Sequence, residues 1–184
     1  MQAATVDNEH RNVADLDADN WKRAAQRSMH PAARALGSDV LAAIAAGLAA
    51  VTVPWELGLG EVPTGRRFQR VLATEAYEAW VICWPSGELL DMHDHGGSAG
   101  AFSVVSGQLD EATIQSGVQV IRTFGPGDTT AFDASRVHAV ANRRSAVVTS
   151  VHVYSPPLSS MMYYESDDSG SLVAIGEDAG GWNV

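Results

Sequence analysis

The chain changes character near Gly65, and this change limits the folds that it can adopt. Beyond Gly65, short runs rich in β-branched and aromatic residues alternate with clusters of Gly, Asp, Asn, Ser and Pro, at intervals of about eight to twelve residues. The runs are RFQRVLAT, YEAWVICW, GAFSVV, VQVIRTF, VHAVAN and AVVTSVHVY. This rhythm is typical of antiparallel barrels and sandwiches, so the sequence predicts a mainly β fold.

The residues before Gly65 have a helical pattern. A helix is expected over residues 19–36, interrupted at Pro31, which lacks an amide donor. A second helix is expected over Ser38–Ala50, with Ser38 as its N-cap and with many alanines, which favour helix. We predict a single domain over residues 1–184, with an N-terminal helical part (1–60), an antiparallel β-barrel of jelly-roll type (61–165) and a Gly- and acid-rich C-terminal tail lying over the barrel (166–184).

Composition limits the partners and the location. The net charge of −10 disfavours nucleic acids and anionic membranes as partners, because both attract proteins through Lys and Arg side chains. Cys83 is the only cysteine, so no intramolecular disulfide can form and a reducing compartment is expected. The longest apolar run, Val40–Val53, has 14 residues, whereas a bilayer span needs about 20. The N-terminal residues lack a secretory signal pattern. We therefore expect a cytoplasmic monomer that binds neither nucleic acid nor membrane.

Two histidines, His93 and His95, are separated by one residue in an apolar, Gly-punctuated run. If this run is a strand, both side chains lie on the same face, where two imidazoles can bind one metal ion. Asp91 would share that face and is a possible fourth ligand, whereas Asp94 would point to the other face. A pair of exposed or merely packed histidines is the alternative interpretation of this motif.

The surrounding spacing resembles the two-part cupin signature, which is carried by Gly87, His93, His95, Gly107, Gly127, His138 and Asn142. A cupin barrel would bring His138 beside the first two histidines. The acidic ligand position of cupins falls at or near Gly100, which has no side chain to bind a metal ion. Three neutral imidazole ligands leave a bound divalent ion with its full positive charge and with coordination positions open for other ligands. Ligand type alone would permit Zn, Cu or Ni as well as Fe.

A second polar group lies in TSVHVYSPPL, where Ser150, His152 and Tyr154 alternate with two valines. On a strand the three polar side chains share one face. If that face is buried, the three groups must bond one another or a ligand, because unpaired buried polar groups are costly. The opposite arrangement, with the valines in the core and the polar face outside, is equally compatible with the alternation.

Several stretches together make the chain resemble the cysteine dioxygenase family of cupin thiol dioxygenases, over roughly Phe68 to Pro157. They are Cys83–Trp84, HDH at 93–95, GQLDE at 107–111, RVHAVAN at 136–142 and SVHVYSPP at 150–157. The resemblance implies that His93, His95 and His138 hold a mononuclear non-haem Fe(II), and that Ser150, His152 and Tyr154 form a hydrogen-bonded relay ending at the iron and the substrate. It also implies that Arg70 binds the substrate carboxylate and that the Ser155–Pro156 bond is cis.

The same resemblance implies that an L-cysteine thiol is oxidised by O2 to cysteine sulfinic acid. Gly100 stands where animal members have the cysteine that crosslinks to the tyrosine, so Tyr154 is expected to be unmodified and Cys83 to lie in the core. Two alternatives stay open. Another thiol, such as 3-mercaptopropionate or mercaptosuccinate, could be the substrate, since Gln69 adjoins Arg70 and a one-residue slip would exchange their faces. A non-catalytic metal-sensing cupin would need the histidines without the relay.

Overall fold

The computed structural model describes residues 35–52, 65–167 and 170–178. All of these belong to one compact unit, Ala35–Val184. The helix expected over residues 19–36 falls almost entirely outside the described residues. Helix α2 spans Ser38–Val51, close to the expected second helix. Its N-cap is Gly37, whose backbone carbonyl accepts the first bonds, and no side-chain cap is present, so the prediction that Ser38 caps the helix was wrong.

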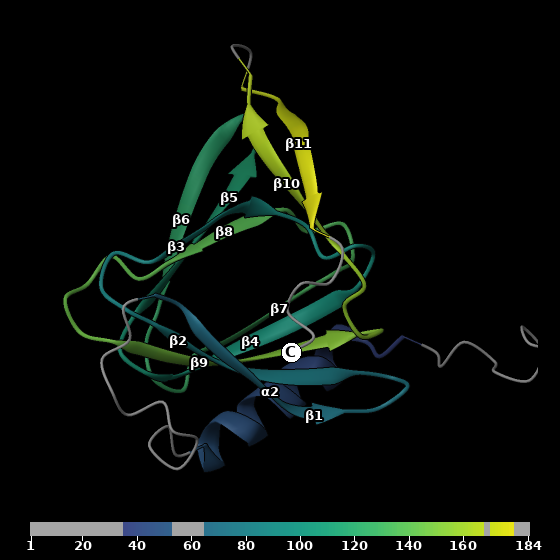
Figure 1. Ribbon diagram of the computed structural model, residues 1–184, viewed down its shortest axis with the longest axis vertical. Helices are drawn as coiled ribbons and strands as arrows, with labels where there is room; N and C mark the ends of the chain where they lie inside the picture. Colours follow the sequence, from purple (N-terminus) through teal and green to yellow (C-terminus); the bar gives the residue numbers. More distant parts are fainter. Residues whose placement is uncertain (1–34, 53–64, 168–169, 179–184) are drawn as a thin grey trace, which may run out of the picture. The chain divides into compact units, whose positions relative to one another are not determined.

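Antiparallel strands follow the helix and form two sheets (Figure 1). The five-stranded sheet has the order β1-β2-β9-β4-β7. Its strands are β1 (Arg67–Ala73), β2 (Glu78–Trp84), β9 (Val148–Ser155), β4 (Ala99–Ser106) and β7 (Thr129–Phe132). The six-stranded sheet has the order β11-β10-β3-β8-β5-β6. Its strands are β11 (Leu172–Asp178), β10 (Met161–Ser166), β3 (Leu89–His93), β8 (His138–Ala141), β5 (Leu109–Gln115) and β6 (Val118–Phe124).

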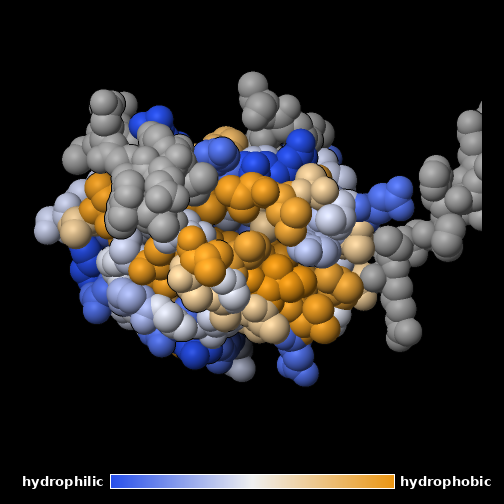
Figure 2. Space-filling model, turned by 90° about the horizontal axis from the view of Figure 1, so that it is seen from below, coloured by the Kyte–Doolittle hydropathy of each residue, from blue (hydrophilic) through white to orange (hydrophobic). Residues whose placement is uncertain are grey.

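The two sheets face each other, and α2 covers the outer face of the five-stranded sheet (Figure 1). Apolar side chains fill both interfaces. One buried cluster joins α2 to the sheet and includes Leu41, Ala45, Val81, Cys83, Ala101, Val151 and Val153. The other lies on the inner faces and includes Trp80, Trp84, Phe102, Leu109, Phe124, Phe132 and Val140. The outward side of α2 is also apolar, with Val40 and Val51 exposed, and apolar side chains gather on the face shown in Figure 2.

Strand β9 is buried along its whole length, which decides between the two arrangements left open by its alternation. Val151 and Val153 face α2, and the polar side chains between them point toward the opposite sheet. Neither face of β9 is solvent-exposed, because it is the central strand of its sheet and both faces are covered. Cys83 packs in the same cluster as the two valines, as expected of a core residue.

The architecture confirms the predicted class, a mainly β cupin fold with a helix before it. In the described part of the chain the two sheets stay separate instead of closing into one hydrogen-bonded barrel. The C-terminal segment also differs from the expected tail, because β11 pairs with β10 as the edge strand of the six-stranded sheet. Among the described residues, no helix is long and apolar enough to cross a membrane.

Candidate metal centre

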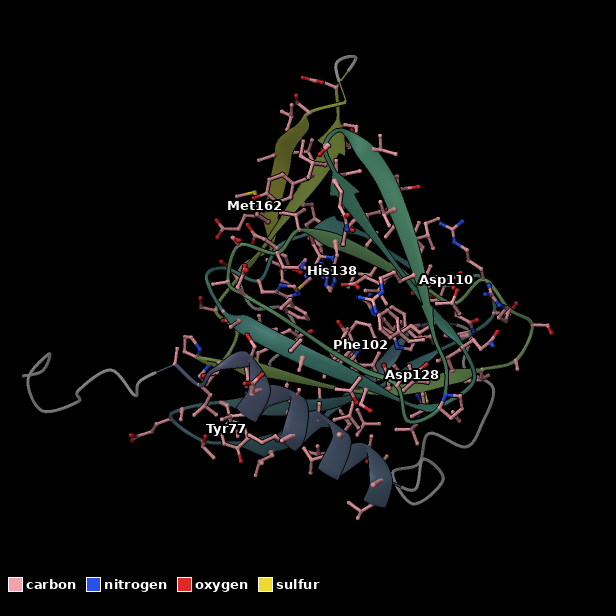
Figure 3. The ribbon with its side chains drawn as sticks, turned by 180° about the vertical axis from the view of Figure 1, so that it is seen from behind. Tyr77, Phe102, Asp110, Asp128, His138 and Met162 are labelled. Atoms are coloured by element: carbon pink, nitrogen blue, oxygen red, sulfur yellow. The ribbon has the colours of Figure 1, made fainter. Side chains whose placement is uncertain are left out.

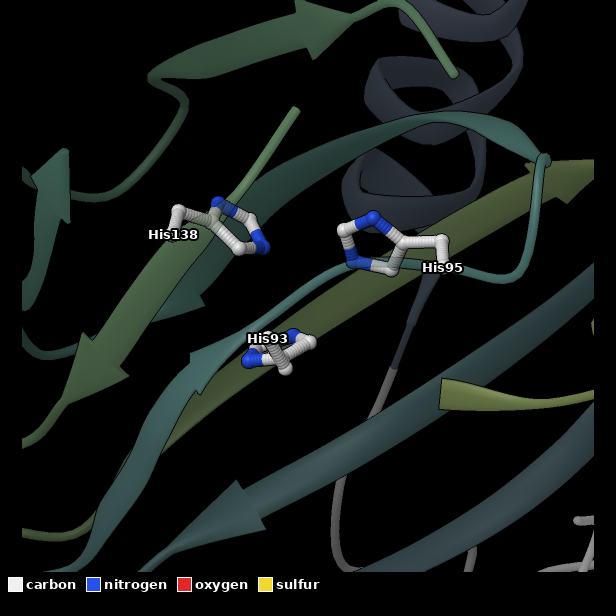
Figure 4. Close-up of side chains that lie close together, drawn as sticks. All are labelled: His93, His95 and His138. Atoms are coloured by element: carbon white, nitrogen blue, oxygen red, sulfur yellow. The ribbon is translucent and has the colours of Figure 1, made fainter. Parts of the chain in front are cut away.

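His138 lies in the space between the two sheets (Figure 3). His93 and His95 come together with it there (Figure 4). His93 is the last residue of β3 and lies opposite His138, the first residue of β8. One ligand nitrogen from each of the three imidazoles lies within 4.8 Å of the other two. All three side chains are buried, and in Figure 4 their rings face a common space.

His95 lies beyond the end of β3, in the turn that leads to β4, so the expected strand is shorter than the HDH motif suggested. Asp94 holds this turn. Its Oδ1 accepts hydrogen bonds from the amide of Gly96 at 3.0 Å and that of Met162 at 3.2 Å, and its Oδ2 accepts one from the Tyr164 hydroxyl at 2.7 Å. The carboxylate of Asp94 therefore points away from the histidines, as predicted, and shapes the loop that carries His95.

Hydrogen bonds define the tautomers of two of these histidines. Nδ1 of His93 donates to the carbonyl oxygen of Asp91 at 2.7 Å, and Nδ1 of His138 donates to Oε1 of Glu111 at 2.7 Å. A carbonyl or carboxylate oxygen can only accept, so Nδ1 carries a proton in both rings and Nε2 is the nitrogen that is left for a metal ion. Orientation by such a partner is the usual arrangement of histidine ligands to metals.

His95 has no hydrogen-bond partner at either ring nitrogen among the described residues, although its side chain is fully buried. Burial lowers the pKa of His95 well below its usual range and that of His93 to about 3, helped by the neighbouring histidines. Both rings are therefore neutral, which is the form that binds a metal ion. An unpaired buried nitrogen is costly, and a divalent cation at the centre of the three rings would satisfy it.

The donor set therefore fits a metal ion held by three imidazoles, and its chemistry is compatible with Fe, Zn, Cu or Ni. Among the described residues, the group of converging ligand atoms contains only the three histidines. Asp91, considered as a fourth ligand, contributes its backbone carbonyl to His93 instead.

Gly100 occupies the acidic ligand position of the cupin signature, and its surroundings explain why no side chain stands there. It lies opposite both Tyr154 and Phe132 in the sheet. A Cβ at this position would lie 2.5 Å from the Phe132 ring and 3.0 Å from Cδ1 of Tyr154. Phe132 in turn stacks on His95, with ring centroids 4.7 Å apart. Aromatic packing therefore fills the space that a carboxylate ligand would need.

A continuous chain of hydrogen bonds runs along the inner face of β9 toward the histidines. Nε1 of Trp84 donates to Oγ of Ser150 at 2.9 Å. Ser150 Oγ lies 2.9 Å from Nε2 of His152, and the Tyr154 hydroxyl lies 3.2 Å from Nδ1 of the same ring. The Tyr154 ring packs against His95 at 5.2 Å between centroids. The expected trio is thus connected, and Trp84, which the sequence did not assign to it, forms its far end.

Burial keeps the relay uncharged. Desolvation, followed by the charge of nearby histidines, lowers the pKa of His152 to about 3. Desolvation raises the pKa of the Tyr154 hydroxyl far above its usual value, a shift that the nearby charge of Arg66 opposes and that of Glu78 reinforces. Near neutral pH, a neutral imidazole therefore connects two hydroxyl groups. The adjoining Ser155–Pro156 peptide bond is cis, as the resemblance implied.

Glu111 is a member of this site that sequence reasoning missed as a functional residue. It is buried on β5, and it also lies 4.0 Å from Arg136. Burial alone would raise the pKa of Glu111, but the hydrogen bond with His138 and the nearby positive charges lower it overall, so the carboxylate is ionised. The stretch GQLDE contained this residue, but only the register of β5 against β8, with Thr113 opposite His138, brings its carboxylate to the imidazole.

A pocket of about 280 Å³ opens beside the relay. Tyr154 and Arg66 line it, together with Phe68, Trp80, Ile82, Leu90, Leu158, Met161, Tyr163 and Asp178. Its wall is therefore largely apolar, with two tyrosine side chains and two charged groups among the described residues. A pocket of this size can hold a small organic molecule beside Tyr154, whose ring packs against His95.

Arg70, the expected carboxylate-binding residue, is not among the described residues that line this pocket. It lies opposite Trp80 in the β1–β2 pair, on the inner face, and its Nη1 forms an ion pair with Oε2 of Glu78 at 3.4 Å. Gln69 lies opposite Val81, which packs against α2, so Gln69 is on the other face of the sheet. Because of this register, Gln69 lies on the face of the sheet that is directed away from the pocket. Among the described residues that line the pocket, Arg66 is the positively charged one.

Comparison with known proteins gives the following results. A model of the cysteine dioxygenase type I family matches residues 55–167, more than half of the chain. No curated protein matches the sequence. Among solved structures, a Thermus thermophilus protein is similar at 16% identity and a TM-score of 0.48, over 55% of this chain and 94% of that one.

Two further solved structures are similar at comparable levels. A cupin domain of an XRE family transcriptional regulator from Enterobacter cloacae has 20% identity and a TM-score of 0.43, over 50% of this chain and 96% of that one. A cupin superfamily protein from Desulfitobacterium hafniense has 12% identity and a TM-score of 0.45, over 52% of this chain and 83% of that one. By its family match, the chain belongs to the cysteine dioxygenase type I family, whose members are metal-dependent thiol dioxygenases of cupin fold.

Proposed function

We propose that this protein is an Fe(II)-dependent thiol dioxygenase that converts L-cysteine and O2 into cysteine sulfinic acid. The observation that carries the proposal is the hydrogen-bonded chain from Trp84 through His152 to Tyr154, which ends against His95, one of the three buried histidines. A cupin that only binds a metal ion needs the histidines but has no use for a relay of this kind. Membership of the family supports the same conclusion.

His93, His95 and His138 would hold the iron, which when bound supplies the redox chemistry that adds both atoms of O2 to the thiol sulfur. The three ligands contribute no negative charge, since all are imidazoles. A bound divalent ion would thus keep its full positive charge in a buried site and would favour an anionic thiolate as a further ligand. Phe132, packed over Gly100, keeps a protein carboxylate from taking that place.

Tyr154 and His152 would position the reactants and hold a proton. The Trp84 indole can only donate, so Ser150 accepts from it and is free to donate its own proton to Nε2 of His152. The proton of His152 is then on Nδ1, which donates to the Tyr154 oxygen. In this direction the hydroxyl proton of Tyr154 is free to point toward a molecule in the pocket. The high pKa of Tyr154 keeps that proton on the oxygen.

The test is metal analysis combined with O2 uptake. Protein expressed with iron is expected to contain about one Fe per chain and to consume O2 when L-cysteine is added, with cysteine sulfinic acid as the product. The thiol panel should include cysteamine, 3-mercaptopropionate and mercaptosuccinate. A protein that retains stoichiometric zinc and oxidises no thiol after Fe(II) reconstitution would contradict the proposal and favour a metal-sensing role.

A dioxygenase of another small thiol is the second candidate, and the apolar wall of the pocket favours it. Six of the described lining residues, Phe68, Trp80, Ile82, Leu90, Leu158 and Met161, present apolar surface next to Tyr154. Such a wall favours a thiol that lacks the charged amino group of cysteine, because an unpaired charge is costly beside apolar side chains. A higher kcat/KM for 3-mercaptopropionate than for L-cysteine in the same panel would select this candidate and leave the iron site unchanged.

A further inference from the structure

Residues 156–160 form a connecting segment between β9 and β10 and bring Leu158 into the pocket wall. Most of the other described wall residues lie on strands, whose backbones are held by sheet hydrogen bonds. The connecting segment has no regular structure. It begins with two prolines, which have no amide to donate. Its position therefore depends on contacts other than a strand ladder.

Both ends of the connecting segment are fixed. At its start, Oγ of Ser155 donates to the carbonyl oxygen of Ala76 at 2.7 Å and accepts from the amide of Leu36 at 2.9 Å. At its end, the backbone of Ser160 lies so close to Gly96 that a Cβ there would be 2.6 Å from the Ser160 carbonyl oxygen. The middle of the segment needs an anchor of its own.

Glu78, the first residue of β2, supplies that anchor. Its Oε1 accepts a hydrogen bond from the Leu158 amide at 3.0 Å. No other hydrogen bond joins residues 156–160 to the rest of the described chain. Oε2 of the same carboxylate lies 3.4 Å from Nη1 of Arg70, and the Glu78 side chain is only 2% exposed. The acceptor is therefore fixed in place and shielded from water.

The bond to Glu78 places the Leu158 side chain against the inner apolar cluster, which includes Trp80 and Tyr154. Leu158, Trp80 and Tyr154 all line the pocket. Glu78 lies directly opposite Tyr154 in the β2–β9 pair, so it holds Leu158 near the end of the relay. A leucine fixed there occupies space beside the tyrosine, and a longer thiol would have to displace it.

We propose that Glu78 is a positioning residue for substrate selection, which holds Leu158 in the pocket wall and thereby limits the length of the thiol that fits beside Tyr154. This role rests on the proposed function, since it concerns the selectivity of the same site. A single excess methylene in a closed apolar pocket changes kcat/KM by roughly 10- to 200-fold, so the shorter of two related thiols is preferred.

The test uses the full-length, Fe(II)-loaded protein with L-cysteine and L-homocysteine, which is one methylene longer. Glu78→Ala removes the acceptor, whereas Glu78→Gln keeps an oxygen for the Leu158 amide. Leu158→Ala removes the side chain that Glu78 positions, and the double variant Glu78→Ala/Leu158→Ala shows whether the two residues act together.

Three measurements are made on each protein. Anaerobic calorimetry gives the binding constants of the two thiols, and O2 uptake gives kcat and KM. Hydrogen exchange, read by mass spectrometry over residues 154–163, reports the protection of the Leu158 amide without any thiol. Thermal unfolding verifies that each variant is folded.

Leu158→Ala should raise the homocysteine-to-cysteine ratio of binding constants and of kcat/KM by about tenfold, because it opens the wall. Glu78→Ala should raise both ratios through KM, with kcat for L-cysteine within about threefold of wild type. It should also speed exchange over the segment by about tenfold, as expected for a lost hydrogen bond. Glu78→Gln should resemble wild type in all three measurements. The double variant should change the ratios no more than Leu158→Ala alone.

Unchanged exchange in Glu78→Ala overturns the proposal, and so does faster exchange with unchanged ratios, since the bond would then be merely structural. Ratios that shift further in the double variant than in Leu158→Ala also overturn it, because Glu78 would act through another residue. Wild-type protein that oxidises neither thiol contradicts the proposed function, but the role of Glu78 stands if binding and exchange follow the expected pattern. Wild-type protein that binds neither thiol overturns both.

Discussion

The carboxylate of Glu111 lies 2.7 Å from Nδ1 of His138, and both side chains are buried. A buried, ionised acid therefore orients a metal-binding imidazole and increases its basicity. The sequence offered no direct sign of this pair, since 27 positions separate the two residues.

Glu111→Gln should weaken iron binding by about 10- to 100-fold, because an amide oxygen still accepts from Nδ1 but carries no charge. Competition with a chelator of known affinity measures the change. Asp110→Asn is the matched control, since Asp110 is also buried on β5 but bonds Arg144 and Thr123. Equal iron affinity in wild type and Glu111→Gln would show that the carboxylate does not support the metal site.

His95→Ala should lose stoichiometric iron, because one of three neutral ligands is removed from the group. Elemental analysis of protein purified from iron-supplemented cells measures this. His152→Ala is the control: its ring contacts Ser150 and Tyr154, and it should retain iron. Retention of iron in His95→Ala would mean that the metal lies elsewhere.

Tyr154→Phe should keep iron and lower kcat on the order of a hundredfold, the usual contribution of a positioned proton donor. Trp84→Phe should have a smaller effect in the same direction, because it removes the donor that orients Ser150. Full turnover in Tyr154→Phe would be inconsistent with the proposed relay.

The intact mass of the wild-type protein should equal the sequence mass, since Gly100 offers no sulfur for a thioether beside Tyr154.

Gly100→Ala should destabilise the protein by about 1–3 kcal/mol, the usual cost of overpacking, because the new methyl group would lie 2.5 Å from the Phe132 ring. Urea unfolding of the apoprotein measures the loss. Gly47→Ala is the control, since apart from the adjacent helix backbone and the neighbouring residues no described atom lies within 4 Å of its Cβ position in α2, and alanine there should stabilise the helix by about 0.5–1 kcal/mol. A Phe132→Val background should relieve the Gly100→Ala penalty, and a penalty that persists would place the strain elsewhere.

The apoprotein should become less stable as pH falls from about 6.5 toward 3, and His152 should contribute to this loss. In the unfolded chain its imidazole takes up a proton near pH 6.5, whereas in the folded protein it does so only near pH 3. Between these values the unfolded state binds more protons, so acid favours unfolding. His152→Gln should reduce the slope of unfolding free energy against pH by up to about 1.4 kcal/mol per pH unit. Tyr154→Phe, which keeps the imidazole, should leave the slope unchanged.

Local periodicity was sufficient to predict the helix at Ser38–Val51, the run of strands and the shared face of the β9 trio. These features depend on residues close together in the sequence. The three-histidine group was predictable because the spacing of glycines and histidines resembled a known signature. Burial of both faces of β9 was not predictable, because the same alternation of polar and apolar residues occurs in a strand with one exposed face.

The features that the sequence did not reveal depend on partners from distant strands. Arg70 forms an ion pair with Glu78 on the neighbouring strand, a contact that the sequence alone does not show. Strand β11 was not predicted, because its Gly- and acid-rich sequence has weak strand propensity. It forms a strand by pairing with β10. The turn at His95 depends on Asp94 reaching Tyr164, which is 70 positions away.

The order of strands places the histidines and the relay where the backbone is held from two sides. His93, His138 and the β9 trio lie on β3, β8 and β9, which are inside their sheets and are paired on both sides. The pocket wall draws on both kinds of strand: Phe68 and Asp178 come from the edge strands β1 and β11, whereas Trp80, Ile82 and Leu90 come from interior strands. A shift of β1 or β11 would disturb pairing with one neighbouring strand, whereas a shift of β3, β8 or β9 would disturb two. The rim of the pocket is therefore less tightly constrained by its own sheet than the histidine group is.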